Sequence, residues 1–390
     1  MIIGIPREIM PGELRVSATP ETVEKMVKDG ATVLIESGAG VGSYFYDDAY
    51  ENAGGKIVNS PEDVYTESNV ILKVKEPQFN EKLNKHEVEM MHEGQYLITF
   101  LHPATPSNHE MIKMLQEKGI ISLTLDGIPR ISRAQSMDAL SSMSTCAGYK
   151  GMVMAIDDIA KFVPPIGSAV GMIRPATVFV LGCGVAGLRA IATAKGMGAN
   201  VYAADIRPDA VEQAKSLGAK IIELGVPEKV AISKDGKHAK QLPSKWLEVE
   251  RENIKDIVSK SDIVFLSALV FGKVAPILIT EEMVKTMQSG SCIVDISIDQ
   301  GGNCEVTEPG VKIVKDEVII NGIKNIPGML ATSATRMFSH NIYNLLAYVT
   351  EDGEIKLNLK DEITSSILVT KDGKIHHRGT LEAMGLKRVK

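Results

Sequence analysis

The chain has 390 residues, of which 44% are hydrophobic and 24% are charged, and its formal net charge is −6. This composition is typical of a globular protein with two or three domains. The negative charge argues against a nucleic-acid partner or an anionic membrane surface. The most apolar stretch, 263–271, is too short to cross a bilayer, and no signal peptide is expected. Four widely separated cysteines favour a reduced, cytoplasmic location and no metal site.

The first 125 residues alternate between predicted strands and helices. A helix is expected at 19–29, where Thr19 is a candidate N-cap, Pro20 lies in the first turn and Gly30 ends the helix. This alternation predicts a doubly wound parallel α/β sheet. The other expected strands and helices are strands at 1–6, 32–36, 56–58, 69–74, 96–101 and 120–125, and helices at 46–53 and 107–118.

Polar residues follow three of these strands, at the edge where doubly wound sheets bind their ligands. Arg15 lies in the loop after the first strand, and His102 ends the strand at 96–101. Lys73 and Lys75 follow the apolar run 70–72, and alternation predicts that they share a face. Singly, each is most simply a surface charge or a cap. Together they would suit a small carboxylate or 2-oxoacid, with His102 as proton donor.

The segment 129–142 mixes Arg, Gln, Asp and Ser directly after a predicted strand. Its simplest interpretation is the start of a helix, with Ser136 or Asp138 as the N-cap. That interpretation leaves Arg130 and Gln135 without a role. The segment runs into a long helix, 148–162, that is expected to cross between two domains. Residues at such a junction would face an interdomain cleft, where the nicotinamide end of a dinucleotide would lie.

The most informative stretch begins with an apolar strand at 178–181 and continues into a glycine-rich turn and a helix. Gly182 permits the tight turn, Gly184 lets the backbone approach a pyrophosphate, and Gly187 lets helix and strand pack closely. A second strand, 200–204, ends on Asp205, 18 residues after Gly187, where a ribose 2′-hydroxyl would be held. This order predicts dinucleotide binding.

The nature of the dinucleotide depends on two neighbouring residues. Asp205 favours NAD(H), whereas Arg207 could meet the 2′-phosphate of NADP(H). NAD is therefore the predicted cofactor, with Arg207 left as the argument for the alternative. The predicted cofactor-binding residues are Gly182, Gly184, Val185, Ala186, Gly187, Asp205, Ile206, Arg207, Ala268 and Leu269.

The remaining chain continues the α/β alternation. The lysine-rich stretch 226–250 is predicted to be a mobile loop. Asp299, at the end of the expected strand 292–298, is either a turn residue or a carboxylate aimed at the nicotinamide ribose or the substrate. We expect the domains to be 141–329, which binds the dinucleotide, and 1–140 with 330–390, because the tail should return to the first domain. The other expected elements are helices at 211–218, 280–287 and 333–348, and strands at 220–224, 263–266, 354–359 and 366–370.

Nearly the whole sequence resembles the alanine dehydrogenase/nicotinamide nucleotide transhydrogenase superfamily. It is most similar to the branch of the NAD(H)-binding alpha subunit (domain I) of proton-translocating transhydrogenase. The resemblance implies two Rossmann-like domains. The motifs that carry it are PRISRAQSMDALSS at 129–142, GCGVAGLRAIATAK at 182–195, PILITEEMV at 276–284, GGNCE at 301–305 and VTKDGKI at 369–375.

The transhydrogenase resemblance implies roles for four residues of the segment 129–142. Arg130, Asp138 and Ser141 would surround the nicotinamide end of NAD(H), and Gln135 would reach toward NADP(H) on a partner subunit. Residues 237–240 would lie in a loop that closes over the cofactor, although the family has a tyrosine where His238 stands.

The resemblance also implies how a transhydrogenase component would be assembled. It would be a homodimer that works with NADP(H)-binding and membrane subunits. Its location would be cytoplasmic, at the membrane only through those partners.

A competing resemblance is to alanine dehydrogenase itself. Arg15, Lys75 and His102 match its substrate-binding and acid/base positions, and 298–302 matches its IDQGG motif. Because some transhydrogenase components keep the first three residues, only Asp299 favours the dehydrogenase, while 129–142 and the long tail favour the transhydrogenase. The dehydrogenase would act on pyruvate or a related 2-oxoacid. A non-catalytic, nucleotide-sensing protein is the third class considered.

Overall fold

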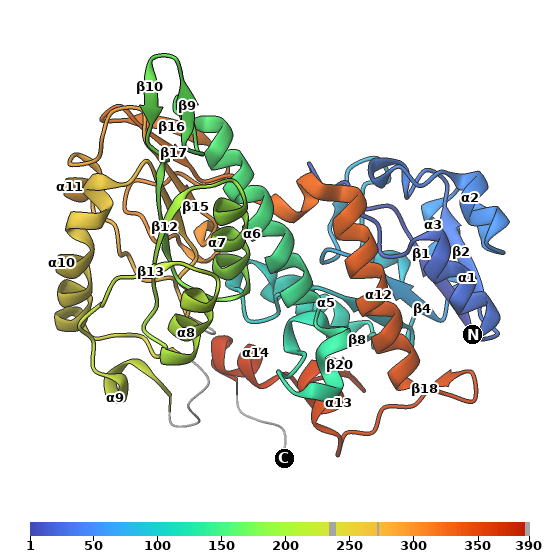
Figure 1. Ribbon diagram of the computed structural model, residues 1–390. Coiled ribbons are helices and arrows are strands. Elements are labelled where there is room, and N and C mark those ends of the chain that lie inside the picture. Colours follow the sequence, from blue (N-terminus) through green and yellow to red (C-terminus); the bar gives the residue numbers. More distant parts are fainter. Residues whose placement is uncertain (234–238, 271–272, 387–390) are drawn as a thin grey trace. The chain divides into compact units, whose positions relative to one another are not determined.

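The computed structural model describes residues 1–233, 239–270 and 273–386 (Figure 1). The chain forms two compact units, which are described separately. Unit 1 comprises Met1–Met143 and Gly328–Lys390, and unit 2 comprises Ser144–Pro327. Within the described residues, no helix is long and apolar enough to cross a membrane.

Unit 1 is built on an eight-stranded sheet with the order β21-β20-β8-β7-β4-β1-β2-β3. The six strands from the first half of the chain are parallel, whereas β20 and β21 join the edge in antiparallel pairings. The order reverses between β1 and β4, which is the switch point where doubly wound sheets bind ligands. The strands are β1 Ile2–Ile5, β2 Thr32–Glu36, β3 Lys56–Val58, β4 Val70–Leu72, β7 Tyr96–Thr99, β8 Ile121–Thr124, β20 Leu368–Lys371 and β21 Lys374–Ile375.

Helices of unit 1 begin and end where local chemistry predicts. The α1 helix starts after Thr19, whose side chain accepts a hydrogen bond from Thr22 N–H, and Pro20 occupies its first position. Gly30, with φ +89°, follows its C-cap. Two small hairpins are β5 Phe79–Asn80 with β6 Lys85–His86, and β18 Thr350–Glu351 with β19 Glu354–Ile355. The helices are α1 Pro20–Lys28, α2 Asp47–Asn52, α3 Pro61–Glu67, α4 Glu87–Met90, α5 His109–Glu117, α12 Ala331–Val349, α13 Glu362–Ile367 and α14 Arg378–Ala383.

Unit 2 contains a seven-stranded sheet with the order β13-β12-β11-β14-β15-β17-β16. All pairings are parallel except that of β16 with β17. Its switch point lies between β11 and β14, directly at the glycine-rich turn. Both units are thus doubly wound α/β folds, which confirms the predicted fold class. The strands are β11 Thr177–Leu181, β12 Asn200–Ala204, β13 Lys220–Ile221, β14 Ile263–Leu266, β15 Cys292–Asp295, β16 Lys312–Lys315 and β17 Val318–Asn321.

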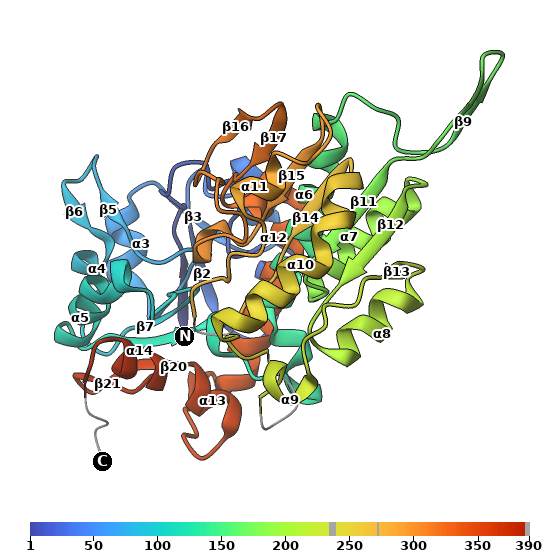
Figure 2. The same cartoon turned by 90° about the vertical axis from the view of Figure 1, so that its left-hand side faces the viewer.

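Two apolar cores cover the two faces of this sheet (Figure 2). One packs α6, α7 and α8 against the sheet, and the other packs α10 and α11 against its opposite face. An antiparallel hairpin of β9 Ile166–Ser168 and β10 Gly171–Ile173 projects from the unit. The helices are α6 Ala139–Asp158, which begins in unit 1, α7 Val185–Gly196, α8 Pro208–Ser216, α9 Glu228–Ala231, α10 Ser244–Lys260 and α11 Glu281–Val284.

Two predictions of secondary structure were partly wrong. The stretch 226–250 contains α9 and the first two turns of α10, because an amphipathic face hidden among its lysines packs on the sheet. The expected strand 366–370 begins two residues later, since Asp361 caps the short helix α13. The β16–β17 pair was not predicted.

Candidate functional site

The glycine-rich turn connects β11 to α7 in unit 2. Gly182 has φ +93°, in the left-handed region that favours glycine. A Cβ atom on Gly187 would lie 1.9 Å from the carbonyl oxygen of Gly182, so only glycine fits there. A Cβ atom on Gly184 would meet no atom within 4 Å. Gly187 therefore serves packing, and Gly184 faces open space.

The N-terminus of α7 is suited to a pyrophosphate. Gly184 is its N-cap, and no side chain caps the helix. Val185 and Ala186 follow as the first two helical residues. The free N–H groups and the helix dipole favour a bound anion. The residues present therefore fit the dinucleotide that the motif predicts.

Asp205 follows β12 and is tied to the glycine turn. Its Oδ2 accepts a hydrogen bond from Cys183 N–H at 2.7 Å, and its Oδ1 accepts one from Arg207 N–H at 2.8 Å. The Arg207 guanidinium also donates to Asp205, at 3.0 and 3.2 Å. Arg207, considered above as a 2′-phosphate ligand, is thus already paired, while Ile206 packs into the cores beside α10.

A buried asparagine, which was not predicted from the sequence, shapes the loop after β14. The Asn303 amide donates to Ala268 O at 2.8 Å, and its Oδ1 accepts from Ala268 N–H at 2.9 Å. Ser267 Oγ donates to Gly182 O at 2.8 Å and links this loop to the glycine turn. Leu269 is exposed next to these contacts. The available signal was the GGN triplet directly after a predicted strand.

Asn303 is held in turn by Asp295, which ends β15. Asp295 Oδ2 accepts hydrogen bonds from the N–H groups of Asn303 and Cys304, at 2.7 and 3.0 Å. Burial raises the pKa of Asp295 because the ionised carboxylate is desolvated. The carboxyl ends of β11, β12, β14 and β15 thus form one hydrogen-bonded dinucleotide site.

Asp299 lies outside that network. It belongs to a 3₁₀ turn, Ile298–Gln300, that Gly301 ends with φ +106°. Its side chain is 62% exposed and lies 3.9 Å from Lys324 Nζ. Both interpretations of Asp299 remain compatible with this position.

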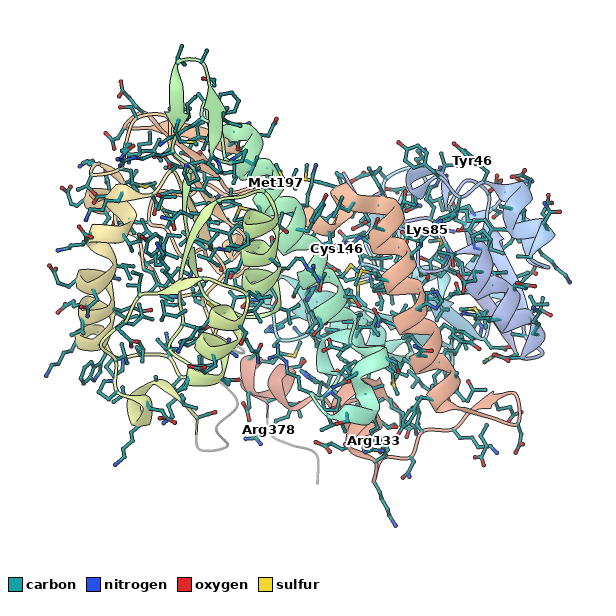
Figure 3. All side chains as sticks on the ribbon, in the orientation of Figure 1. Tyr46, Lys85, Arg133, Cys146, Met197 and Arg378 are labelled. Carbon is teal, nitrogen blue, oxygen red and sulfur yellow. The ribbon has the colours of Figure 1, made fainter. Side chains whose placement is uncertain are left out.

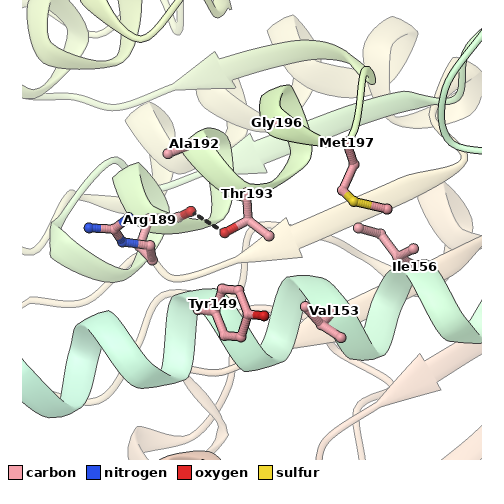
Figure 4. Close-up of a pocket in the computed structure, with 8 residues that line it drawn as sticks. All are labelled: Tyr149, Val153, Ile156, Arg189, Ala192, Thr193, Gly196 and Met197. Carbon is pink, nitrogen blue, oxygen red and sulfur yellow. Dashed lines mark hydrogen bonds between the residues drawn. The ribbon is translucent and has the colours of Figure 1, made fainter. Parts of the chain in front are cut away.

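A surface groove of about 520 Å³ lies elsewhere in unit 2, between α6 and α7 (Figure 4). Tyr149, Val153 and Ile156 line it from α6, and Met197 lies beyond the end of α7. Its lining is mainly apolar and includes no residue of the glycine turn. The groove is therefore not part of the dinucleotide site.

In unit 1, Arg15 follows β1 and is already paired. It forms a bidentate ion pair with Glu13, at 2.7 Å from Nε and 2.5 Å from Nη2, and both residues are buried. Burial raises the pKa of Glu13, but the hydrogen bonds and charge of Arg15 outweigh burial and lower it. Arg15 Nη1 also contacts Met143 Sδ at 3.0 Å. A substrate carboxylate would have to share Arg15 with Glu13.

His102 follows β7 and is paired with an aspartate that was not predicted from the sequence. Its Nδ1 lies 2.8 Å from Asp126 Oδ1, and its ring stacks on Phe100. Burial lowers the pKa of His102, but Asp126 outweighs burial and raises it. Asp126 has its own pKa lowered to about 2, because His102 and Thr124 stabilise the carboxylate against burial. The pair can hold and release a proton.

The two lysines after β4 do not share a face, so that prediction was wrong. Lys73 is fully buried and forms ion pairs with Glu87 at 2.9 Å and Glu8 at 3.4 Å. The strand ends at Leu72, and alternation therefore does not continue through these residues. Lys75 is half-buried, and its charge acts on both Glu13 and His102. Arg15, Lys75 and His102 thus gather at the switch point of unit 1.

The segment 129–142 is firmly anchored in unit 1. Arg133 forms an ion pair with Asp361 at 2.7 Å (Figure 3). Ser136 O accepts hydrogen bonds from Asn341 and Asn344 of α12, at 2.9 and 3.1 Å.

Asp138 precedes α6, and its carboxylate accepts hydrogen bonds from Ser141 N–H and Oγ–H, at 2.9 and 2.6 Å. Asp138 is therefore the N-cap of the long helix, in agreement with one interpretation of the sequence.

Two predicted site residues project from this anchored segment. The side chains of Arg130 and Gln135 are exposed and form no hydrogen bond or ion pair with the described residues. Lys237 and His238, expected in the closing loop, lie outside the described residues. Within the described portion of the chain, no cluster of His, Cys, Asp and Glu could hold a metal ion.

The fold and the glycine turn together define a dinucleotide-binding protein with two α/β units. Residues 4–147 match the family described as "Alanine dehydrogenase/PNT, N-terminal domain", and residues 152–378 match its C-terminal domain. The chain belongs to the alanine dehydrogenase/PNT family.

Relatives from both branches of the family are similar over nearly the whole chain. The first of the separate chains that form the NAD(P) transhydrogenase alpha subunit of Rhodospirillum rubrum is 40% identical, covering 97% of this chain and 98% of that protein. "Alanine dehydrogenase" of Bacillus subtilis (strain 168) is 29% identical, covering 100% and 96%. A crystal structure of transhydrogenase from Sinorhizobium meliloti has a TM-score of 0.82 at 33% identity, covering 97% and 99%.

Proposed function

We propose that this chain is the NAD(H)-binding component of an NAD(P) transhydrogenase and exchanges a hydride with NADP(H) held by a partner subunit. The chain is an NAD-dependent oxidoreductase of its family. The higher identity to the transhydrogenase relative supports this branch. The structural observation that carries the proposal is the anchored segment 129–142, from which Arg130 and Gln135 project without a partner among the described residues.

NAD(H), when bound, supplies or accepts the hydride. The protein binds and orients it: the N-terminus of α7 holds the pyrophosphate, Asp205 holds the adenosine ribose, and Ala268 and Leu269 line the site. Arg130, Asp138 and Ser141 would orient the nicotinamide end. The hydride step needs no proton transfer, so these groups need not titrate.

A partner subunit is needed because the sequence holds one dinucleotide fingerprint, 182–187. Hydride transfer requires near-attack contact, with the reacting atoms about 3–3.5 Å apart. The NADP(H) site must therefore be brought by another chain. Gln135, exposed and unpaired among the described residues, is the residue best suited to align that second cofactor.

The second candidate is an amino-acid dehydrogenase that reduces pyruvate or a related 2-oxoacid with ammonia. The cluster of Arg15, Lys75 and His102 at the switch point of unit 1 supports it. The buried Arg15–Glu13 pair counts against it, because the guanidinium that should bind the carboxylate is already neutralised.

One assay separates the two candidates. The purified chain is mixed with NADH, pyruvate and ammonium, and NADH oxidation is followed by its absorbance, with glyoxylate and 2-oxobutyrate as further substrates. The transhydrogenase proposal predicts no turnover by the isolated chain. Rapid turnover that is lost in His102→Ala would replace the proposal with the dehydrogenase.

A homodimer formed through unit 2 completes the proposal. Val170 and Met172, on the projecting β9–β10 hairpin, are 92% and 72% exposed, and a two-stranded hairpin is marginally stable alone. The apolar α6–α7 groove offers a matching surface on the second copy, and Met197 at its rim is exposed (Figure 3). Light scattering should give the mass of two chains, and replacing Val170 and Met172 by serine should give one. A wild-type monomer at micromolar concentration would contradict this arrangement.

A further inference from the structure

We propose that Glu250 is a second acidic determinant of cofactor choice, which acts beside Asp205 to disfavour a 2′-phosphate. This inference rests on the proposed dinucleotide site. It addresses a problem that the structure raises, because Asp205 is paired with Arg207. A carboxylate and a guanidinium together carry no net charge, so this pair alone gives weak electrostatic discrimination between NADH and NADPH.

The α10 helix places Glu250 toward this pair. Leu247, Glu250 and Ile254 follow the three- and four-residue spacing of one helix face. Leu247 packs with Ile206, the residue between Asp205 and Arg207, and Ile254 lies in the core with Ala204. Glu250 is only 4% exposed. The buried face of α10 therefore carries a carboxyl group to the end of β12.

No described side chain or backbone group compensates the Glu250 carboxyl by a hydrogen bond. Arg251, its neighbour on α10, directs its guanidinium to Ile277 O, at 2.6 and 3.0 Å. A buried carboxyl that lacks a partner is costly, since its charge is poorly solvated. Such a group is more easily explained by a role at the neighbouring site than by stability.

The charges around Glu250 define how the site responds to pH. Burial raises the pKa of Glu250 to about 7, the Asp205 carboxylate contributes to this rise, and Arg251 opposes it. Below that pH the cluster of Glu250, Asp205 and Arg207 is neutral, and above it the cluster carries one net negative charge. Cys183, which also borders Asp205, stays a neutral thiol because burial raises its pKa.

The consequence is a pH-dependent preference for NADH. A phosphate gains negative charge near pH 6, and Arg207 alone would then bind it more tightly as pH rises. Ionisation of Glu250 reverses that trend. We expect the ratio of NADPH to NADH dissociation constants to rise roughly tenfold between about pH 6 and pH 8.5, as one added charge within several ångströms would produce.

Titration of the wild-type chain and two variants with NADH and NADPH over this pH range tests the proposal, with nicotinamide fluorescence as the readout. Glu250→Gln should abolish the rise in the ratio and leave NADH affinity within about twofold, since NADH carries no 2′-phosphate. Glu250→Asp keeps the charge and should keep the rise. A ratio that is flat or falling in the wild-type chain would overturn the proposal, even if the variants fail to fold. An identical profile in Glu250→Gln would also overturn it. Failure of NADH to bind would instead refute the proposed function.

Discussion

Replacing Gly187 by alanine tests the close contact on which the glycine turn depends. The added Cβ atom would lie 1.9 Å from Gly182 O and 3.0 Å from Ser267 Oγ. Because the nearer obstruction is backbone, the turn must move by about 1 Å in a close-packed interior. We expect a loss of about 2–3 kcal/mol in the free energy of unfolding, typical of an overpacked core. The same displacement should weaken NADH binding by about tenfold or more.

Two other glycines supply matched controls. Gly184 has room for a methyl group and φ −74°, so Gly184→Ala should fold normally. It should still bind NADH poorly, since the methyl group occupies the approach of the pyrophosphate. Gly196, the last residue of α7, also has free space. Gly196→Ala should bind NADH normally and gain up to about 1 kcal/mol from helix propensity.

Urea unfolding and fluorescence titration with NADH measure the two quantities separately. If Gly187→Ala keeps wild-type stability and affinity, the close-packing argument is wrong. If Gly184→Ala binds NADH as the wild type does, the pyrophosphate does not approach the backbone there.

Three further substitutions give expected outcomes. Asp126→Asn should lower the pKa of His102 in an NMR titration; the pair stabilises the fold below the unfolded pKa of His102, and that contribution is lost as pH rises through the raised folded value. An unchanged pKa would show that Asp126 does not control the ring. Asn303→Ala should cost about 2–4 kcal/mol and weaken NADH binding, because it strands the buried N–H and C=O groups of Ala268; wild-type affinity would remove its positioning role. Glu250→Gln should stabilise the protein at about pH 8 by up to roughly 3 kcal/mol and have little effect at about pH 4, because a carboxyl whose pKa is raised to about 7 loses stability as pH rises from its unfolded value. A gain that is equal at both pH values would contradict this.

Local chemistry in the sequence predicts much of the fold. Thr19 and Pro20 mark the start of α1, and Gly30 marks its end, because caps and fixed φ angles act within a few residues. The glycine turn is equally readable, since Gly182 and Gly187 have no alternative residue that fits. Asp205 was predicted from its position at the end of β12 alone.

The partners of the site residues could not be read from the sequence. Arg15 is neutralised by Glu13 only because burial forces the two charges together. Lys73 is paired with glutamates that come from distant segments of the chain. Asn303 matters through a loop 35 residues away, which folding brings to its amide. Such contacts depend on tertiary packing, to which periodicity and turn signals are blind.

The most direct test of the central claim is single-turnover hydride transfer between two proteins. The chain loaded with NADH is mixed in a stopped-flow instrument with the purified NADP(H)-binding subunit of a transhydrogenase loaded with NADP⁺. Wild-type chain should form NADPH, Gln135→Ala should transfer more slowly with NADH affinity nearly unchanged, and Gln213→Ala, an exposed glutamine on α8, should behave as wild type. Absence of NADPH from the wild-type pair, with both cofactors shown to be bound, would contradict the account.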